Sequence, residues 1–135
     1  AHLKAADAAP QFRIEAMILC ALRDTGLTEE FTRITHELQA ATRALPVLSP
    51  HSDTRDVRLR AYFETAFQEI FEDLNEDHPK LAAQDMTTAV VAMMEGLWVD
   101  FLLHPQDFDR KRAARIVFRT LAGLLPEHFD ITGAK

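Results

Sequence analysis

Two carboxylates lie close to the chain's only tryptophan, at a spacing that could serve to bind a cation. Glu95 and Asp100 interrupt the otherwise apolar run AVVAMMEGLWVDFLL at residues 89–103. A carboxylate inside an apolar helix is costly without a partner, which would be either a positive group of a ligand or a residue of a second copy. A carboxylate near Trp98 and Tyr62 would suit a quaternary ammonium ligand, because aromatic faces attract cations. The residues leave both roles open.

Aromatic and methionine side chains are the other candidates for a small-molecule site. Ligand sites in helical bundles are built from side chains on facing helices, and methionine adapts to ligands of irregular shape. The same residues would serve equally well as core packing, since apolar periodicity does not distinguish a core from a cavity. The predicted ligand-binding residues are Phe12, Met17, Tyr62, Phe63, Phe67, Met86, Met93, Met94 and Trp98.

The remaining ionisable residues show no pattern typical of a catalytic or metal site. Five acidic residues share one face of a predicted helix, and with His78 they could bind a metal, although a solvated outer face is the simpler interpretation. No HExxH spacing occurs. A Cys20–His36 nucleophile would lack a third residue to orient it. We therefore predict no enzyme activity, no metal and no cofactor. The acidic residues are Glu69, Glu72, Asp73, Glu76 and Asp77.

The apolar pattern predicts an all-α chain, an antiparallel bundle of five to six helices. No segment shows sustained strand-like alternation, and no Asn-Gly or Asp-Gly hairpin signal occurs. Each of the six prolines lies where a helix would start or stop. We expect a loop at residues 46–54 and a fifth helix capped by Asp107. The other helices are expected at about residues 10–24, 28–45, 53–75 and 79–103, with Thr28 as a cap and Gly26 as a stop.

Length and composition indicate one domain at residues 1–128, followed by a flexible tail at residues 129–135. The net charge of −6 disfavours direct binding to a phosphate backbone. The single cysteine, Cys20, excludes an internal disulfide and fits a reducing compartment such as the cytoplasm. The apolar run at residues 89–103 is too short to span a bilayer, which needs roughly 20 apolar residues. We therefore predict no membrane segment.

The same run predicts self-association. It is apolar nearly all the way round a helix, so packing one face on one core cannot bury it. A soluble helix of this kind needs a second surface, and another copy of the chain is the expected one. Gly96 fits this interpretation, because glycine costs about 1 kcal/mol relative to alanine inside a helix but admits a close neighbour. Simple tolerance of the glycine is the alternative.

Three short segments near the end of the chain resemble the end of TetR/AcrR-family transcriptional regulators. They are Met93-Met94-Glu95-Gly96-Leu97-Trp98, Asp107-Phe108-Asp109-Arg110 and Ala113-Ala114-Arg115-Ile116. The resemblance is to the subgroup with a betaine-regulator-type C-terminal domain. That subgroup commonly has an acidic residue before Gly-Leu-Trp in the penultimate helix, then Phe-Asp and a final helix rich in alanine and arginine. The resemblance covers roughly residues 89–126.

This resemblance implies a homodimer in which the last two helices of each subunit form a four-helix interface. Nothing here looks like the family's N-terminal helix-turn-helix unit, so we expect DNA contact only through a domain absent from this chain. The implied function is the ligand-sensing and dimerisation domain of a repressor, in which a small-molecule effector alters DNA binding. A helical homodimeric module without a ligand is the alternative. The predicted interface residues are Glu95, Gly96, Leu97, Phe101, Val117, Phe118, Leu121 and Leu124.

Overall fold

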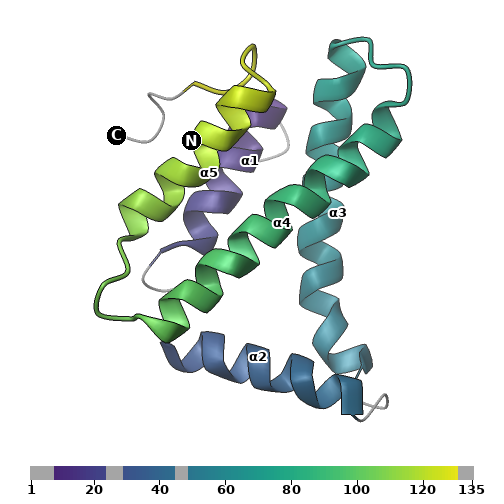
Figure 1. Cartoon of the computed structure of the whole chain (residues 1–135). Helices are drawn as coiled ribbons and strands as arrows, with labels where there is room; N and C mark the ends of the chain where they lie inside the picture. Colours follow the sequence, from purple (N-terminus) through teal and green to yellow (C-terminus); the bar gives the residue numbers. More distant parts are fainter. Residues whose placement is uncertain (1–7, 24–28, 45–48, 131–135) are drawn as a thin grey trace, which may run out of the picture.

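The computed structural model describes residues 8–23, 29–44 and 49–130, and its regular elements are all helices. This confirms the all-α prediction. In Figure 1, α3 and α4 cross as the two longest helices, α1 and α5 lie together on one side, and α2 runs across one end. The helices are α1 (Pro10–Ala21), α2 (Glu29–Ala44), α3 (Ser49–Asp73), α4 (Pro79–Leu103) and α5 (Arg110–Leu124).

Two helix starts differ from the prediction. α3 begins at Ser49, inside the predicted loop, because Pro50 can occupy a first helical turn where its missing N–H is not needed. α5 begins at Arg110, and its N-cap is Asp109 rather than Asp107. Asp109 Oδ1 accepts hydrogen bonds from the backbone N–H groups of Lys111 and Arg112, at 2.9 and 3.1 Å.

The other predicted boundaries agree with the structure in part. The bounds of α4 agree with the prediction, whereas α1 ends at Ala21, earlier than expected. Thr28 and Gly26, the predicted cap and stop between the first two helices, lie outside the described residues. Phe129 lies in the predicted tail, but it is buried in the core with 3% of its surface exposed. The packed domain therefore extends past the predicted end at residue 128.

The core lies where α1, α3, α4 and α5 meet. α3 and α4 share the most extensive contact between two helices. The rings of Phe63 and Phe67, one turn apart on α3, stack in the core with their centroids 6.2 Å apart. Burial of such large apolar side chains is the main stabilising contribution to a domain of this size. The largest fully buried side chains are Ile14, Ile18, Phe63, Phe67, Ile70, Val90, Val91, Met94, Val117, Phe118 and Leu121.

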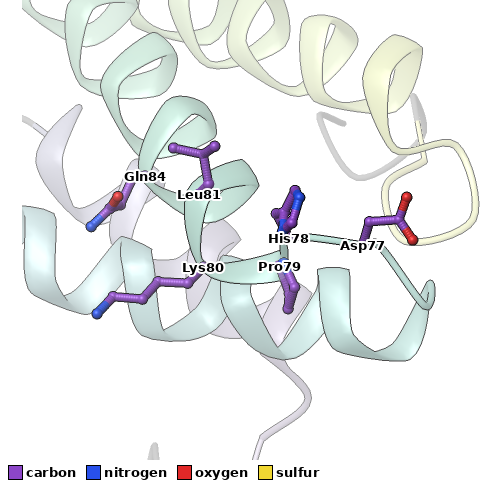
Figure 2. A pocket seen from close by; sticks show the side chains of 6 residues that line it. All are labelled: Asp77, His78, Pro79, Lys80, Leu81 and Gln84. Atoms are coloured by element: carbon purple, nitrogen blue, oxygen red, sulfur yellow. The ribbon is translucent and has the colours of Figure 1, made fainter.

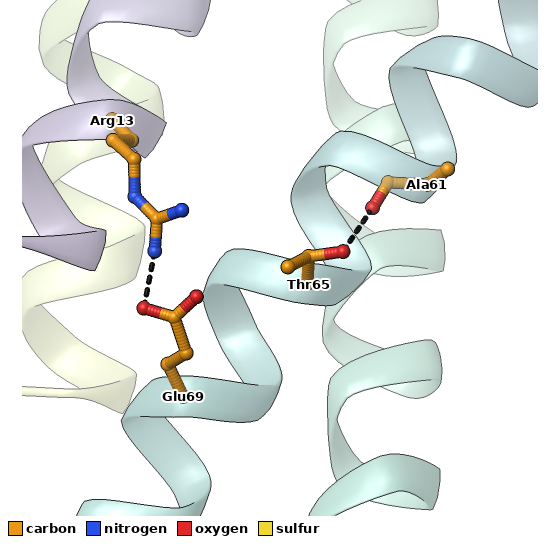
Figure 3. A network of polar contacts seen from close by, with 4 residues as sticks. All are labelled: Arg13, Ala61, Thr65 and Glu69. Carbon is orange, nitrogen blue, oxygen red and sulfur yellow. Dashed lines mark hydrogen bonds and ion pairs between the residues drawn. The ribbon is translucent and has the colours of Figure 1, made fainter. Parts of the chain in front are cut away.

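Polar contacts attach α1 to its neighbours. Arg13 of α1 forms an ion pair with Glu69 of α3 (Figure 3), so this member of the predicted acidic face is not simply solvated. Arg110 of α5 donates a hydrogen bond to the carbonyl oxygen of Leu22 at 3.1 Å. The Arg110 guanidinium also lies 5.1 Å from the centre of the Phe101 ring, close enough for a cation–π contact.

α4 is longer than the apolar run at residues 89–103. It has 25 residues, and by length and composition alone it could cross a membrane. However, one side of α4 packs on the core of the chain, as expected for the central helix of a bundle. Length and composition are therefore weak evidence for a membrane span here. The buried residues of α4 are Ala83, Thr87, Val90, Val91, Met94 and Phe101.

Candidate functional site

A cavity of about 370 Å³ is lined by side chains from α1, α3 and α4. This volume lies at the lower end of the range found for small-molecule sites, roughly 300–1,000 Å³. Most of the lining is apolar or aromatic, with a few polar groups, which is the composition typical of such sites. The lining residues are Met17, Cys20 and Ala21 from α1, Arg58, Leu59 and Tyr62 from α3, and Trp98 from α4.

The chain's only cysteine, only tyrosine and only tryptophan all line this cavity. Cys20 is an exposed free thiol, whereas Tyr62 and Trp98 are half-buried. The indole nitrogen of Trp98 is buried, and it has no hydrogen-bond partner among the described residues. A buried indole N–H usually has a partner, so this unsatisfied donor sets Trp98 apart from ordinary core residues.

Three of the predicted ligand-binding residues, Met17, Tyr62 and Trp98, line the cavity. The other six do not. Phe63, Phe67 and Met94 are completely buried and fill the core. Met86 and Met93 are partly buried and pack against that core. Phe12 lies on the outer side of α1 with 58% of its surface exposed.

Sequence reasoning missed the polar side of the cavity. Arg58 precedes Tyr62 by one helical turn, so both side chains lie on the same face of α3. That spacing is the one signal that could have assigned Arg58 to the site. Cys20 is not among the ligand-binding residues predicted from the sequence, although its spacing from Met17 places the two on one face of α1.

Neither carboxylate of the predicted cation site lines the cavity. Asp100 is exposed, so water solvates its charge and a charged partner would add little stability. Glu95 is half-buried. The aromatic pair of that prediction, Tyr62 and Trp98, does line one cavity. The charged group that accompanies it is the guanidinium of Arg58, whose sign is opposite to the one a quaternary ammonium ligand requires.

The outer side of α4 forms an uncovered apolar face. Its residues recur at intervals of three and four, so they lie along one side of the helix. The neighbouring α5 also carries exposed apolar residues. Figure 1 shows α4 crossing in front of α3 with no other helix in front of it. We define the outer face as Ala92, Gly96, Val99 and Leu103 of α4 with Ile116, Gly123 and Leu124 of α5.

Packing within the chain does not require either glycine of the outer face. A Cβ atom added at Gly96 or Gly123 would meet no heavy atom within 4 Å. Each glycine weakens its helix by about 1 kcal/mol relative to alanine. The close neighbour that would give these glycines a structural role is therefore not found within the described part of the chain.

The predicted interface residues occupy both sides of the two helices. Gly96 and Leu124 lie on the outer face, and Glu95 and Leu97 are half-buried. The other four side chains point inward and belong to the core of the chain, so in this packing they have little surface to offer a second copy. These four are Phe101, Val117, Phe118 and Leu121.

A second hollow, of about 490 Å³, lies at the turn between α3 and α4 (Figure 2). Its lining side chains come from the loop before α4 and from the first two turns of that helix, and apart from Pro79 they are exposed. Across the described ranges, no three His, Cys, Asp or Glu side chains come together in a group that could hold a metal ion. The residues around the hollow are Asp77, His78, Pro79, Lys80, Leu81 and Gln84.

Comparison with known proteins gives one family match, which covers all five helices. The family is described as BetI-type transcriptional repressor, C-terminal, and it matches residues 10–126. No curated protein is significantly similar to the chain, and no solved structure is either. Because the match extends from the start of α1 to the end of α5, the chain belongs to the family of BetI-type transcriptional repressors, as their C-terminal domain.

Proposed function

We propose that this domain senses a small molecule and joins two copies of the chain. It would be the regulatory part of a cytoplasmic repressor whose DNA contacts are made by a helix-turn-helix unit outside this chain. The observation that carries the proposal is that α4 contributes side chains to two different surfaces, the cavity and the outer face. Trp98 lines the cavity, and the next residue, Val99, lies on the outer face. The family membership of the chain supports the regulatory role.

The proposed mechanism is a shift between two arrangements of the subunits. A ligand favours the arrangement for which it has the higher affinity, and about 1–3 kcal/mol of coupling is sufficient for regulation. Side chains of α4 line the cavity and also form part of the outer face. A displacement of Trp98 by a ligand would therefore reach the subunit interface through one rigid helix. DNA half-sites lie about 34–36 Å apart, so a small rotation of the subunits would change operator binding.

Sedimentation of the chain tests dimerisation. The double substitution of Val99→Asp and Leu103→Asp places two charges on the outer face, and we expect it to convert a dimer into a monomer. Val57→Asp is the matched control, because Val57 is 59% exposed on α3, a helix that contributes no residue to the outer face. Circular dichroism confirms that each variant remains helical. A monomeric parent chain, or a double variant that remains dimeric, would contradict the proposed interface.

Thermal unfolding with a panel of small molecules tests ligand sensing. A ligand that binds only the folded chain stabilises it by about 2.7 kcal/mol at one hundred times its dissociation constant. The fluorescence of Trp98 reports whether binding occurs at the cavity. If the chain dimerises but no compound stabilises it, the alternative of a homodimeric module without a ligand is supported instead.

A further inference from the structure

We infer that the cavity binds an amphipathic anion, a molecule with an apolar body and a carboxylate or similar acidic group held by Arg58. This inference rests on the proposed ligand site and gives its ligand a chemical class. It also reverses the charge that the sequence suggested, since the carboxylates near Trp98 pointed to a cation.

Arg58 is the charged side chain of the cavity lining, and in the described part of the chain it has no ion pair or hydrogen bond. Two other arginines that border the core are already engaged. Arg13 pairs with Glu69, and Arg110 donates to the Leu22 carbonyl. A guanidinium remains charged at all physiological pH values and offers paired donors that match a carboxylate. Arg58 is therefore available for an anionic ligand.

The burial of the lining residues gives the ligand an orientation. Arg58 is exposed, whereas Met17, Leu59 and Trp98 are half-buried. An amphipathic ligand would keep its charged group at Arg58, near solvent, and place its apolar body among the half-buried side chains. The Tyr62 hydroxyl and the Cys20 thiol add weaker hydrogen-bonding groups to the same lining.

Three probes with the same alkyl chain separate the possible charges: octanoate, 1-octanol and octyltrimethylammonium. Two readouts come from the cavity itself, the fluorescence of Trp98 and the rate at which iodoacetamide alkylates Cys20, because each residue is the only one of its type. We expect octanoate to bind about tenfold more tightly than octanol, since hydrogen bonds between charged groups are the stronger ones. The quaternary ammonium probe should bind more weakly than octanol.

Variants of Arg58 test the assigned contact. Arg58→Gln should weaken octanoate binding about tenfold and leave octanol binding unchanged, while Arg58→Lys should retain part of the preference. Lys80→Gln removes the same charge at the hollow of Figure 2 and should change neither affinity. Unfolding measurements confirm that all three variants are folded.

The outcomes separate this inference from the proposed function. If octanol and octanoate bind equally well and Arg58→Gln affects neither, the anion preference is wrong and the ligand cavity stands. If the quaternary ammonium probe binds most tightly, the ligand is a cation and the inference is overturned. If none of the three probes changes Trp98 fluorescence or protects Cys20, the inferred binding of an amphipathic anion is overturned, and the panel of small molecules decides whether the chain senses another ligand.

Discussion

Trp98 and Val99 are consecutive residues of α4, yet Trp98 lines the cavity while Val99, 41% exposed, lies on the outer face. Consecutive side chains point about 100° apart around a helix, so a single helix can serve two surfaces at once. A movement of α4 that accommodates a ligand would also move Val99. The proposed link between ligand binding and the arrangement of the subunits would therefore need no relay through other elements.

Gly96→Ala should affect the monomer and the dimer in opposite directions. The added methyl group meets no heavy atom within 4 Å in the chain, and alanine favours the helix by up to about 1 kcal/mol. In the Val99→Asp, Leu103→Asp background, which we expect to be monomeric, urea denaturation should therefore show increased stability. If the outer face is the proposed dimer interface, sedimentation of Gly96→Ala in the parent chain should show a weaker dimer, because the added methyl group would keep the helix of a second copy away.

Gly123→Ala is the matched substitution on α5, where an added Cβ also has open space. If the glycines allow close approach of a second copy, at least one of the two substitutions must raise the dimer dissociation constant. An unchanged dissociation constant in both variants would show that the glycines are only tolerated.

Thr87→Val should stabilise the chain. Thr87 is 1% exposed, and its hydroxyl oxygen is buried without a hydrogen-bond partner in the described part of the chain. Valine replaces that hydroxyl with a methyl group of similar size, so the free energy of unfolding should rise by about 1 kcal/mol. Urea denaturation measures the change, and Thr88→Val, at an exposed neighbouring position, is the control. A loss of stability would show that the Thr87 hydroxyl has a partner in the folded chain.

Asp109→Ala should destabilise α5, because Asp109 accepts hydrogen bonds from two backbone N–H groups at the start of this helix. Loss of an N-cap costs about 1 kcal/mol. Asp107→Ala removes the same charge from an exposed position that is not the cap, and its effect should stay within about 0.5 kcal/mol. Denaturation of both variants decides between the two aspartates. Equal effects would mean that charge near the helix, rather than the cap, is what stabilises α5.

The limits of α4 were predictable, whereas the start of α5 was not. Pro79 opens α4 and His104-Pro105 follows it, so proline marks both ends. Before α5, however, Asp107 and Asp109 are both suitable caps at nearly the same place in the sequence. The choice between them depends on the backbone path of the preceding turn, which local sequence preferences do not determine.

The composition of the site was only partly predictable, because a core and a cavity require the same apolar residues. Tyr62 lines the cavity, while Phe63, the next residue, is completely buried. On α5, Ile116 is exposed and Val117 is completely buried. On α4, both sides are apolar, so the sequence pattern does not show which side faces inward. Which side of a helix faces inward is set by how the helices pack against one another. For this reason, the predicted interface includes residues that face the core.

Glu15→Gln should stabilise the chain in a pH-dependent way. Burial raises the pKa of the Glu15 carboxyl above its ordinary value of 4.5. Between 4.5 and the raised pKa, the folded chain binds more protons at this site than the unfolded chain, so the contribution of Glu15 to stability falls as pH rises. Above the raised pKa this penalty is complete, and below 4.5 it is absent.

Glutamine cannot ionise, so Glu15→Gln should be more stable than the parent chain at neutral pH. The difference should disappear as the pH falls below 4.5. Urea denaturation across a pH series measures it, and Glu127→Gln controls for the loss of one negative charge at an exposed position. A difference between the Glu15 variant and the parent chain that stays constant with pH would exclude carboxyl desolvation as its cause.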